Sequence, residues 1–202
     1  MVRPTRIRND DLLQTARSLF LRQGPSVSTS EIAQAAGVSE GSLFKRFGNK
    51  EALFLAAMGL KELDWTLDVQ AYVGAATVPE NLHEIALDLL TYFEVLLPRL
   101  TCMSGHPKFH PTEFLRHHPS PPPLRATGYL TEYLEFEIQG GRARACAAEV
   151  VARTLHGSLW GYAFFEHTGL NERLNTDRCT FVKELIDLLW RGLQPSQSER
   201  EA

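Results

Sequence analysis

The sequence has little cysteine, no long hydrophobic run and no signal segment. Cys102, Cys146 and Cys179 are odd in number and show neither a CxxC pair nor a Cys/His spacing, so we expect reduced thiols. No stretch approaches the roughly 20 apolar residues of a membrane-spanning helix, and no apolar segment follows the charged N-terminus. These absences favour a cytoplasmic protein that does not enter a membrane.

The constellations of common enzymes and metal sites are also missing. There is no nucleophile elbow, no phosphate-binding glycine loop and no zinc-protease motif. The proline-rich segment 104–123 holds His106, His110, His117 and His118, but no carboxylate or cysteine there has a supporting spacing. We therefore expect no enzyme, no cofactor and no bound metal ion. We interpret the segment as a loop with solvated histidines and a brief helix at about 111–118.

Charge is unevenly distributed along the chain. Residues 1–50 hold eight Lys or Arg and four Asp or Glu, a formal charge of +4, whereas the other 152 residues carry −7 of the total −3. A basic N-terminal segment on an acidic remainder is the asymmetry expected when one end of a protein meets phosphates.

Apolar residues recur at three- and four-residue spacing almost throughout, and strand signals are nearly absent, which predicts an all-α fold. We expect an N-terminal three-helix domain at residues 1–50, a C-terminal helical domain of about six helices at 51–194, and a disordered tail at 195–202. The expected helices cover about 9–23, 40–47, 50–73, 79–97 (ended by Pro98), 123–138, 143–167 and 176–193, besides one that begins near Ser28.

The stretch from Ser28 to Phe47 predicts two short helices joined by a tight turn. Ser28 and Glu31 have the spacing of a capping box, in which each side chain satisfies the other residue's backbone N–H. Gly37 permits the left-handed conformation of a sharp turn, and Ser39 can cap the second helix. In that helix Leu43 and Phe47 are four residues apart and share the buried face. This pattern predicts a helix-turn-helix.

The opposite face of the second helix carries small and cationic residues. Gly41 and Ser42 allow close approach of DNA, and Ser42 and Lys45 can reach base edges. Arg46 and Lys50 are placed for phosphates, while Asn49 caps the next helix. On the helical wheel Glu40 falls nearer the buried side, in the first turn, where the helix dipole favours an acid.

The segment "TSEIAQAAGVSEGSLFKRFGNKEALF" resembles the DNA-binding signature of tetracycline-repressor (TetR) family regulators, and the preceding "LLQTARSLFLRQG" resembles the family's first helix. The resemblance covers about residues 8–56. It implies a dimer that binds operator DNA and whose C-terminal domain binds a small molecule that releases the DNA. The positions that contact DNA in similar proteins are Thr29, Ser39, Gly41, Ser42, Phe44, Lys45, Arg46 and Lys50. Phe44 stands where a tyrosine is usual, so a phosphate hydrogen bond worth about 1 kcal/mol is lost there.

Two features of the C-terminal domain agree with that expectation. In the last helix the apolar residues span roughly 200°, more than one core requires, and the helix before it is apolar nearly all round. They are either central helices of one domain or the four-helix interface of a homodimer. The candidate interface residues are Leu155, Leu159, Tyr162, Phe181, Leu185 and Leu189.

Aromatic residues at helical spacing are either core or the lining of a ligand cavity, since ligand cavities are mostly apolar. The candidates for a pocket that binds an unknown small-molecule effector are Trp65, Tyr92, Phe93, Met103, Phe109, Trp160 and Phe164.

Together these patterns predict a ligand-responsive repressor that binds a (pseudo)palindromic operator as a homodimer. Two alternatives stay open. One is an activator or co-regulator on the same scaffold, because a DNA-binding domain does not encode the sign of regulation. The other is a helical ligand carrier with a vestigial DNA-binding domain.

Overall fold

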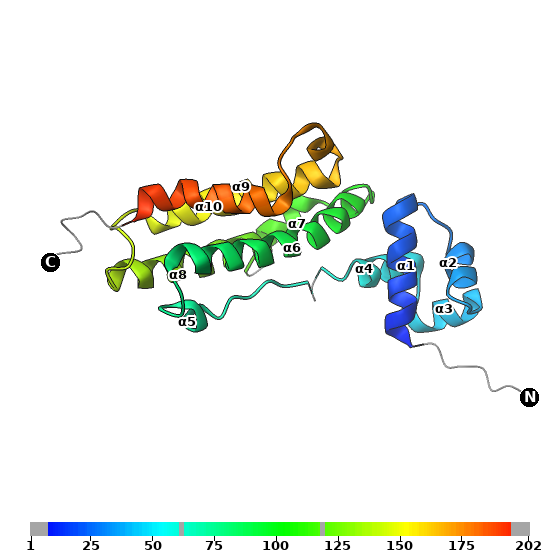
Figure 1. Ribbon diagram of the computed structural model, residues 1–202. Coiled ribbons are helices and arrows are strands. Elements are labelled where there is room, and N and C mark those ends of the chain that lie inside the picture. The colour runs from blue at the N-terminus through cyan, green and yellow to red at the C-terminus, as the bar shows by residue number, and fades with distance from the viewer. Residues whose placement is uncertain (1–7, 61–62, 118–119, 195–202) are drawn as a thin grey trace, which may run out of the picture. The chain divides into compact units, whose positions relative to one another are not determined.

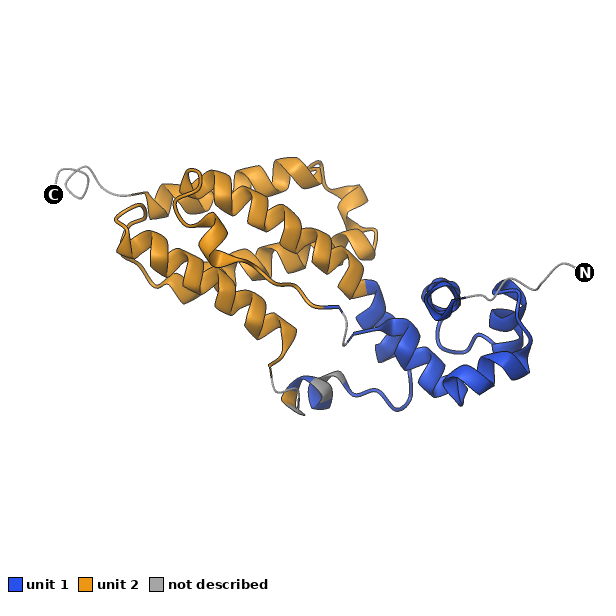
Figure 2. Ribbon diagram, turned by 90° about the horizontal axis from the view of Figure 1, so that it is seen from below, with its two compact units in different colours: residues 1–63, 98–115 blue, residues 64–97, 116–202 orange. Residues whose placement is uncertain are grey.

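The computed structural model describes residues 8–60, 63–117 and 120–194, and every regular element in these ranges is a helix (Figure 1). The predicted all-α fold is confirmed. The chain divides into two compact units (Figure 2). The first, here called the head, comprises residues 1–63 and 98–115, and the second, the body, comprises residues 64–97 and 116–202. The tail predicted at 195–202 lies outside the described residues.

The head begins with four helices, α1 (Asn9–Gln23), α2 (Thr29–Ala35), α3 (Glu40–Phe47) and α4 (Lys50–Met58). Helix α1 packs along α4, and α2 packs against α3. In their core the rings of Phe20 and Phe54 meet edge to face, with centroids 4.9 Å apart. The fully buried side chains of this core are Leu12, Ala16, Phe20, Ile32, Leu43, Leu53, Ala57 and Met58.

The predicted helix starts in the head are confirmed by their hydrogen bonds. The Ser28 hydroxyl accepts from the Glu31 N–H at 3.1 Å, and the Glu31 carboxylate accepts from the Ser28 N–H at 3.0 Å. Ser39 caps α3 and Asn49 caps α4. Gly37 has φ +66°, the left-handed conformation expected in the turn between α2 and α3. Local side-chain chemistry thus sets the orientation at which α3 begins.

The helix predicted at 50–73 is wrong in its length. Helix α4 ends at Met58, because Gly59 takes the left-handed conformation (φ 56°, ψ 37°) that closes a helix C-terminus. A separate short helix, α5 (Val69–Tyr72), begins where the Asp68 side chain accepts from the Ala71 N–H. The boundary expected after residue 50 also differs, since the buried face of α4 belongs to the head core.

The remaining helical elements are α6 (Val78–Ser104), α7 (Pro111–His117), α8 (Pro122–Gln139), α9 (Ala148–His167), the 3₁₀ turn η1 (Leu170–Arg173) and α10 (Arg178–Leu193). Helices α8, α9 and α10 and the turn η1 lie wholly in the body, whereas α6 is divided between the two units and most of α7 belongs to the head. Helices α8 and α9 pack along each other, and α10 lies beside α9 (Figure 1). The rings of Phe93 in α6 and Trp160 in α9 lie 5.2 Å apart and connect α6 to the same core.

Two helix ends differ from prediction. Pro98 was expected to end its helix, but α6 continues to Ser104, because a proline removes only one backbone donor and its neighbours complete the helix. The next-to-last helix begins at Ala148 rather than 143, since the chain after Gly141 turns and the Arg142 and Ala143 N–H groups both bond to the Glu137 carbonyl.

Residues 98–115, which comprise the end of α6 and the segment after it, are counted with the head. The Arg99 guanidinium donates to the Met58 carbonyl at 3.0 Å, and the Cys102 thiol donates to the Phe20 carbonyl at 3.3 Å. Lys108 forms a 2.7 Å ion pair with Glu51. Helix α6 therefore supplies residues to both units.

The body contains a buried ion pair. Glu137 is completely buried, and its carboxylate lies 2.5 Å from the Arg142 Nε and accepts from the Gly74 N–H at 3.3 Å. The Arg142 guanidinium also donates to the Ala76 carbonyl. These bonds attach the loop after α5 to the C-terminal end of α8. Breaking such a pair on one side is costly, because a buried charge loses its compensation.

Among the described helices, none combines the length and the apolar composition needed to cross a membrane. Within the same described residues no group of three or more His, Cys, Asp or Glu side chains is close enough to hold a metal ion.

Candidate functional site

Helix α3 has one buried and one exposed side. Leu43 is fully buried, and Phe47, one turn later, packs partly buried against the head core. The opposite side is open to solvent and carries Gly41, Ser42, Phe44, Lys45 and Arg46. The helix is thus attached to the head through one stripe while its small and cationic residues face outward. The major groove of DNA is wide enough to admit an α-helix, so this exposed side is of the kind that reads DNA.

Hydrogen bonds hold several side chains of this side in place. The Ser39 hydroxyl accepts from the Ser42 N–H at 3.2 Å, and the two hydroxyl oxygens lie 2.8 Å apart. Arg46 donates to the Asn9 side chain at 3.3 Å, so α3 is tied to the start of α1. Ser42 is therefore partly engaged in the cap of its own helix.

Lys50 begins α4 and is half-buried. It borders a hollow of about 440 Å³ that is also lined by Glu51, Phe54 and His106. The His106 ring stacks on Phe54 with centroids 5.0 Å apart, so this histidine of the proline-rich segment is packed rather than solvated as expected. The Lys108 ammonium lowers the pKa of Glu51, which keeps that carboxylate charged beside Lys50.

Thr29 and Glu40 are joined across the two helices of the motif. The Thr29 hydroxyl donates to the Glu40 carboxylate, although the residues are eleven positions apart. Glu40 is exposed, so the expectation that it lies nearer the buried side is wrong. Because α3 has only eight residues, the side chain of its first residue lies outside the contact between the helix and the head core. A carboxylate therefore stands at the start of the exposed side of α3, where sequence reasoning placed none.

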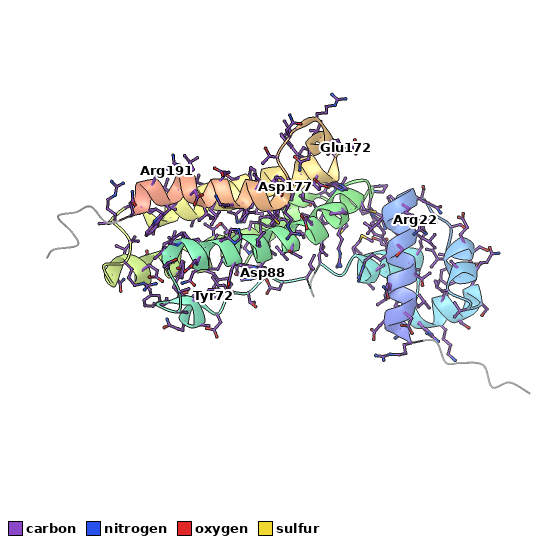
Figure 3. The ribbon with its side chains drawn as sticks, viewed as in Figure 1. Arg22, Tyr72, Asp88, Glu172, Asp177 and Arg191 are labelled. Carbon is purple, nitrogen blue, oxygen red and sulfur yellow. The ribbon has the colours of Figure 1, made fainter. Side chains whose placement is uncertain are left out.

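The body holds an aromatic cluster built on α6 and α9. Phe93 is buried and lies 5.7 Å from Tyr92 and 5.2 Å from Trp160, measured between ring centroids. Trp65 is also buried, and its indole N–H donates at 2.8 Å to Asp88, which Figure 3 labels on α6. Four of the seven predicted pocket residues, Trp65, Tyr92, Phe93 and Trp160, thus lie in the body interior or at its edge.

The other three predicted pocket residues are elsewhere. Met103 is buried in the head core and Phe109 packs against that core, because the end of α6 and the following segment belong to the head. Phe164 is 44% exposed on α9. Assigning these three to one cavity in the body is therefore wrong.

Polar groups in the aromatic cluster were not predicted from the sequence. The Tyr92 hydroxyl is buried and has no hydrogen-bond partner among the described residues. Burial and the nearby Asp64 carboxylate raise the pKa of Tyr92 to about 12. His156 lies 5.0 Å from Phe93, and burial lowers its pKa. Its position four residues before Trp160 places both on one face of a helix, a signal that could have identified it.

The predicted dimer residues divide between core and surface. Leu155 and Leu159 are fully buried and Tyr162 nearly so within the single subunit, where α9 packs along α8 and beside α10, and assigning them to an interface is wrong. Phe181, Leu185 and Leu189 are half-exposed. The exposed apolar residues of the two helices are Val150, Phe164, Phe165 and Leu188. At Gly157 and Gly161 of α9 no atom of the described residues, apart from the adjacent residues and the backbone of the helix itself, lies within 4 Å of the position of an added Cβ, so this face permits close approach.

Comparison with known proteins agrees with this description. Residues 12–57 match the sequence profile of bacterial regulatory proteins of the tetR family. No curated protein matches the sequence. Solved structures with a similar fold include NalD of Pseudomonas aeruginosa, the secondary repressor of the MexAB-OprM multidrug efflux pump, with 22% identity and a TM-score of 0.59 over 92% of this chain and 95% of that one. A TetR transcriptional regulator from Agrobacterium tumefaciens has 20% identity and a TM-score of 0.64 over 95% of this chain and 96% of that one.

Proposed function

Because the N-terminal domain belongs to the tetR family of bacterial regulatory proteins and the chain has the fold of such regulators, we propose that it is a ligand-responsive transcriptional repressor. It binds a (pseudo)palindromic operator as a homodimer. The observation that carries the proposal is helix α3, which is anchored through the buried Leu43 and presents Gly41, Ser42, Lys45 and Arg46 to solvent.

In this proposal the residues divide by role. Lys45 and Ser42 approach base edges, and Gly41 lets the backbone come close. Arg46 and Lys50 neutralise phosphates, Ser39 contacts the DNA backbone at the start of α3, and Phe44 packs against a sugar or a thymine methyl. The Thr29 hydroxyl donates its proton to Glu40. Thr29 therefore influences DNA binding by positioning that carboxylate, not by bonding to a phosphate.

The homodimer uses the exposed face of α9 and α10. Val150, Phe164 and Leu188 give it apolar area, and the two glycines of α9 let the helices of two copies approach. A two-fold axis then places two α3 helices in successive major grooves, with half-sites about 34–36 Å apart or somewhat more.

The effector binds among the aromatic residues of the body, near Trp65, Tyr92, Phe93 and Trp160. Helix α6 carries Tyr92 and Phe93 and ends in the head, where Arg99 bonds to the end of α4. A ligand changes operator affinity only to the extent that it binds the two conformations unequally. NalD is a repressor, which favours repression over activation for a chain of the same fold.

Selection of bound sequences from random DNA tests this function. The full chain should enrich an inverted repeat and bind it roughly 10³-fold or more tightly than scrambled DNA at physiological salt. Lys45→Ala should weaken that binding, whereas Arg144→Ala, an exposed cation of the body, should not. Equal affinity for selected and scrambled DNA would refute the proposal. A reporter gene distinguishes repression from activation. If the protein raises expression when the operator is present, it is an activator instead.

A further inference from the structure

The exposed side of α3 carries one acceptor-only group among its donors. Glu40 is the first residue of the helix and is exposed. In the described part of the chain it takes part in no salt bridge. An unneutralised carboxylate on a surface that faces phosphates weakens binding to DNA of any sequence, so it calls for a compensating contact.

The carboxylate is held by a hydroxyl from the neighbouring helix. The Thr29 hydroxyl has a single proton and donates it to Oε1 of Glu40. Threonine is branched at Cβ, so its side chain has few rotamers. A hydrogen bond from Thr29 therefore restricts the position of the Glu40 carboxylate. Oε2 of Glu40 accepts no hydrogen bond from any described residue, and its lone pairs remain available to a donor outside the protein.

Few side chains next to Glu40 on the exposed side of α3 are long enough to reach far into the groove. Gly41 has no side chain, and the Ser42 side chain is short, with its hydroxyl oxygen 2.8 Å from that of Ser39. Among the first six residues of α3, the long polar side chains are therefore Glu40, which only accepts, and Lys45, which only donates.

The edges of the base pairs in the major groove respond differently to a carboxylate. Cytosine presents the N4 amino donor, whereas guanine and thymine present acceptors that repel an anion. Adenine presents a donor beside the N7 acceptor, which suits an amide better than a carboxylate. We infer that Glu40 is a specificity-determining residue that accepts a hydrogen bond from the N4 amino group of one cytosine in each operator half-site, with Thr29 as its positioning residue. The inference rests on the proposed function.

Glu40→Gln changes this group with almost no change of shape. Glutamine pairs through two hydrogen bonds with adenine N6 and N7, so the preferred base at one position of each half-site changes from cytosine to adenine. The wild-type chain should discriminate against other bases there by roughly 5- to 150-fold, the range typical of one mismatched base pair in a site. Loss of the negative charge also strengthens binding to unrelated DNA, so specificity falls while non-specific affinity rises.

The experiment is selection from random DNA with the full chain and four variants, each checked for an unchanged melting temperature. Glu40→Gln should alter one base position per half-site and leave the others unchanged. Thr29→Val should weaken cytosine preference at that same position, and Thr29→Ser, which keeps the hydroxyl, should restore it. Glu135→Gln removes an equal charge from the exposed surface of α8 and should give the wild-type motif.

Three outcomes overturn the inference or the part of it that concerns Thr29. If Glu40→Gln selects the same base at every position with the same discrimination, Glu40 reads no base although the proposed function stands. If the wild-type chain enriches no motif, the inference and the proposed function both fail. A loss of preference in Thr29→Val spread evenly over all positions would assign Thr29 to the DNA backbone instead.

Discussion

A glutamate in place of Leu188 tests the proposed dimer most directly. Leu188 lies on α10 and is 68% exposed, and it forms one stripe with Phe181 and Leu185 at spacings of four and three residues. Val182 and Ile186, which face the core, are not touched by the change. The substitution therefore alters what the surface offers to a second copy while the subunit core keeps its packing.

The magnitude follows from the exposed fraction of Leu188. Burial of a whole leucine side chain stabilises by about 1.5–3 kcal/mol, so covering the two-thirds that is exposed contributes about 1–2 kcal/mol. A two-fold interface contains the residue twice, which gives about 2–4 kcal/mol in all. Since 1.4 kcal/mol corresponds to tenfold, Leu188→Glu should weaken dimerisation by about 30-fold to 700-fold, and desolvation of the carboxylates adds to that.

Sedimentation velocity over a concentration series measures the dissociation constant directly. The matched control is Leu124→Glu, since Leu124 is also a leucine, is 65% exposed and lies on α8, outside the proposed interface. Both variants should keep the helical circular dichroism of the wild type. Only Leu188→Glu should dissociate, and it should lose affinity for the full operator more than for an isolated half-site.

Two results would refute this reasoning. A Leu188→Glu chain that remains a dimer with an unchanged dissociation constant would show that α10 does not contribute this stripe to the interface. Equal dissociation of both variants would show that added charge on the body, rather than the α9–α10 face, controls association.

Three further changes test the head, the buried ion pair and the aromatic cluster. Lys50→Ala should reduce the slope of log K against log[salt] by about 0.9 for each subunit, since one phosphate contact is lost; an unchanged slope in fluorescence anisotropy would remove Lys50 from the phosphate contacts. Arg142→Met should lower the free energy of unfolding in urea by about 3 kcal/mol, because the buried Glu137 carboxylate loses its cation, and a loss under about 1 kcal/mol would contradict that account. Burial lowers the pKa of His156, so the unfolded chain binds its proton more readily and stability falls as pH drops below about 6.5; His156→Gln should flatten this part of the melting-temperature profile, and an equally steep profile would contradict it.

Local chemistry made the head predictable. The starts of α2 and α3 agree with prediction because the capping residues Ser28 and Ser39 and the turn residue Gly37 act on their own neighbours. Leu43 was identified as an anchor because an eight-residue amphipathic helix has only one apolar stripe. Where a structural feature depends on residues close together in the sequence, the spacing of those residues is enough to predict it.

The body was less predictable because its helices are apolar on several sides. Periodicity identifies buried residues but does not say what buries them, and Leu155 in a subunit core looks the same as a leucine in a dimer interface. Met103 lies on the same helix as Phe93, yet it packs in the head. Long-range packing decides both cases. For the same reason the Thr29–Glu40 bond, which joins two helices, could not be found from a helical wheel.

The distribution of charge gives Glu40 a physical rationale. Residues 1–50 carry +4, and such a segment binds any DNA through counterion release, without regard to sequence. Because a genome offers very many competing sites, a regulator gains more from a higher ratio of specific to non-specific affinity than from tighter binding overall. A carboxylate on the DNA-facing side lowers affinity for every sequence and recovers it only where a donor such as the cytosine amino group meets it. The same residue that weakens general binding therefore sharpens discrimination, and Glu40→Gln should separate these two effects.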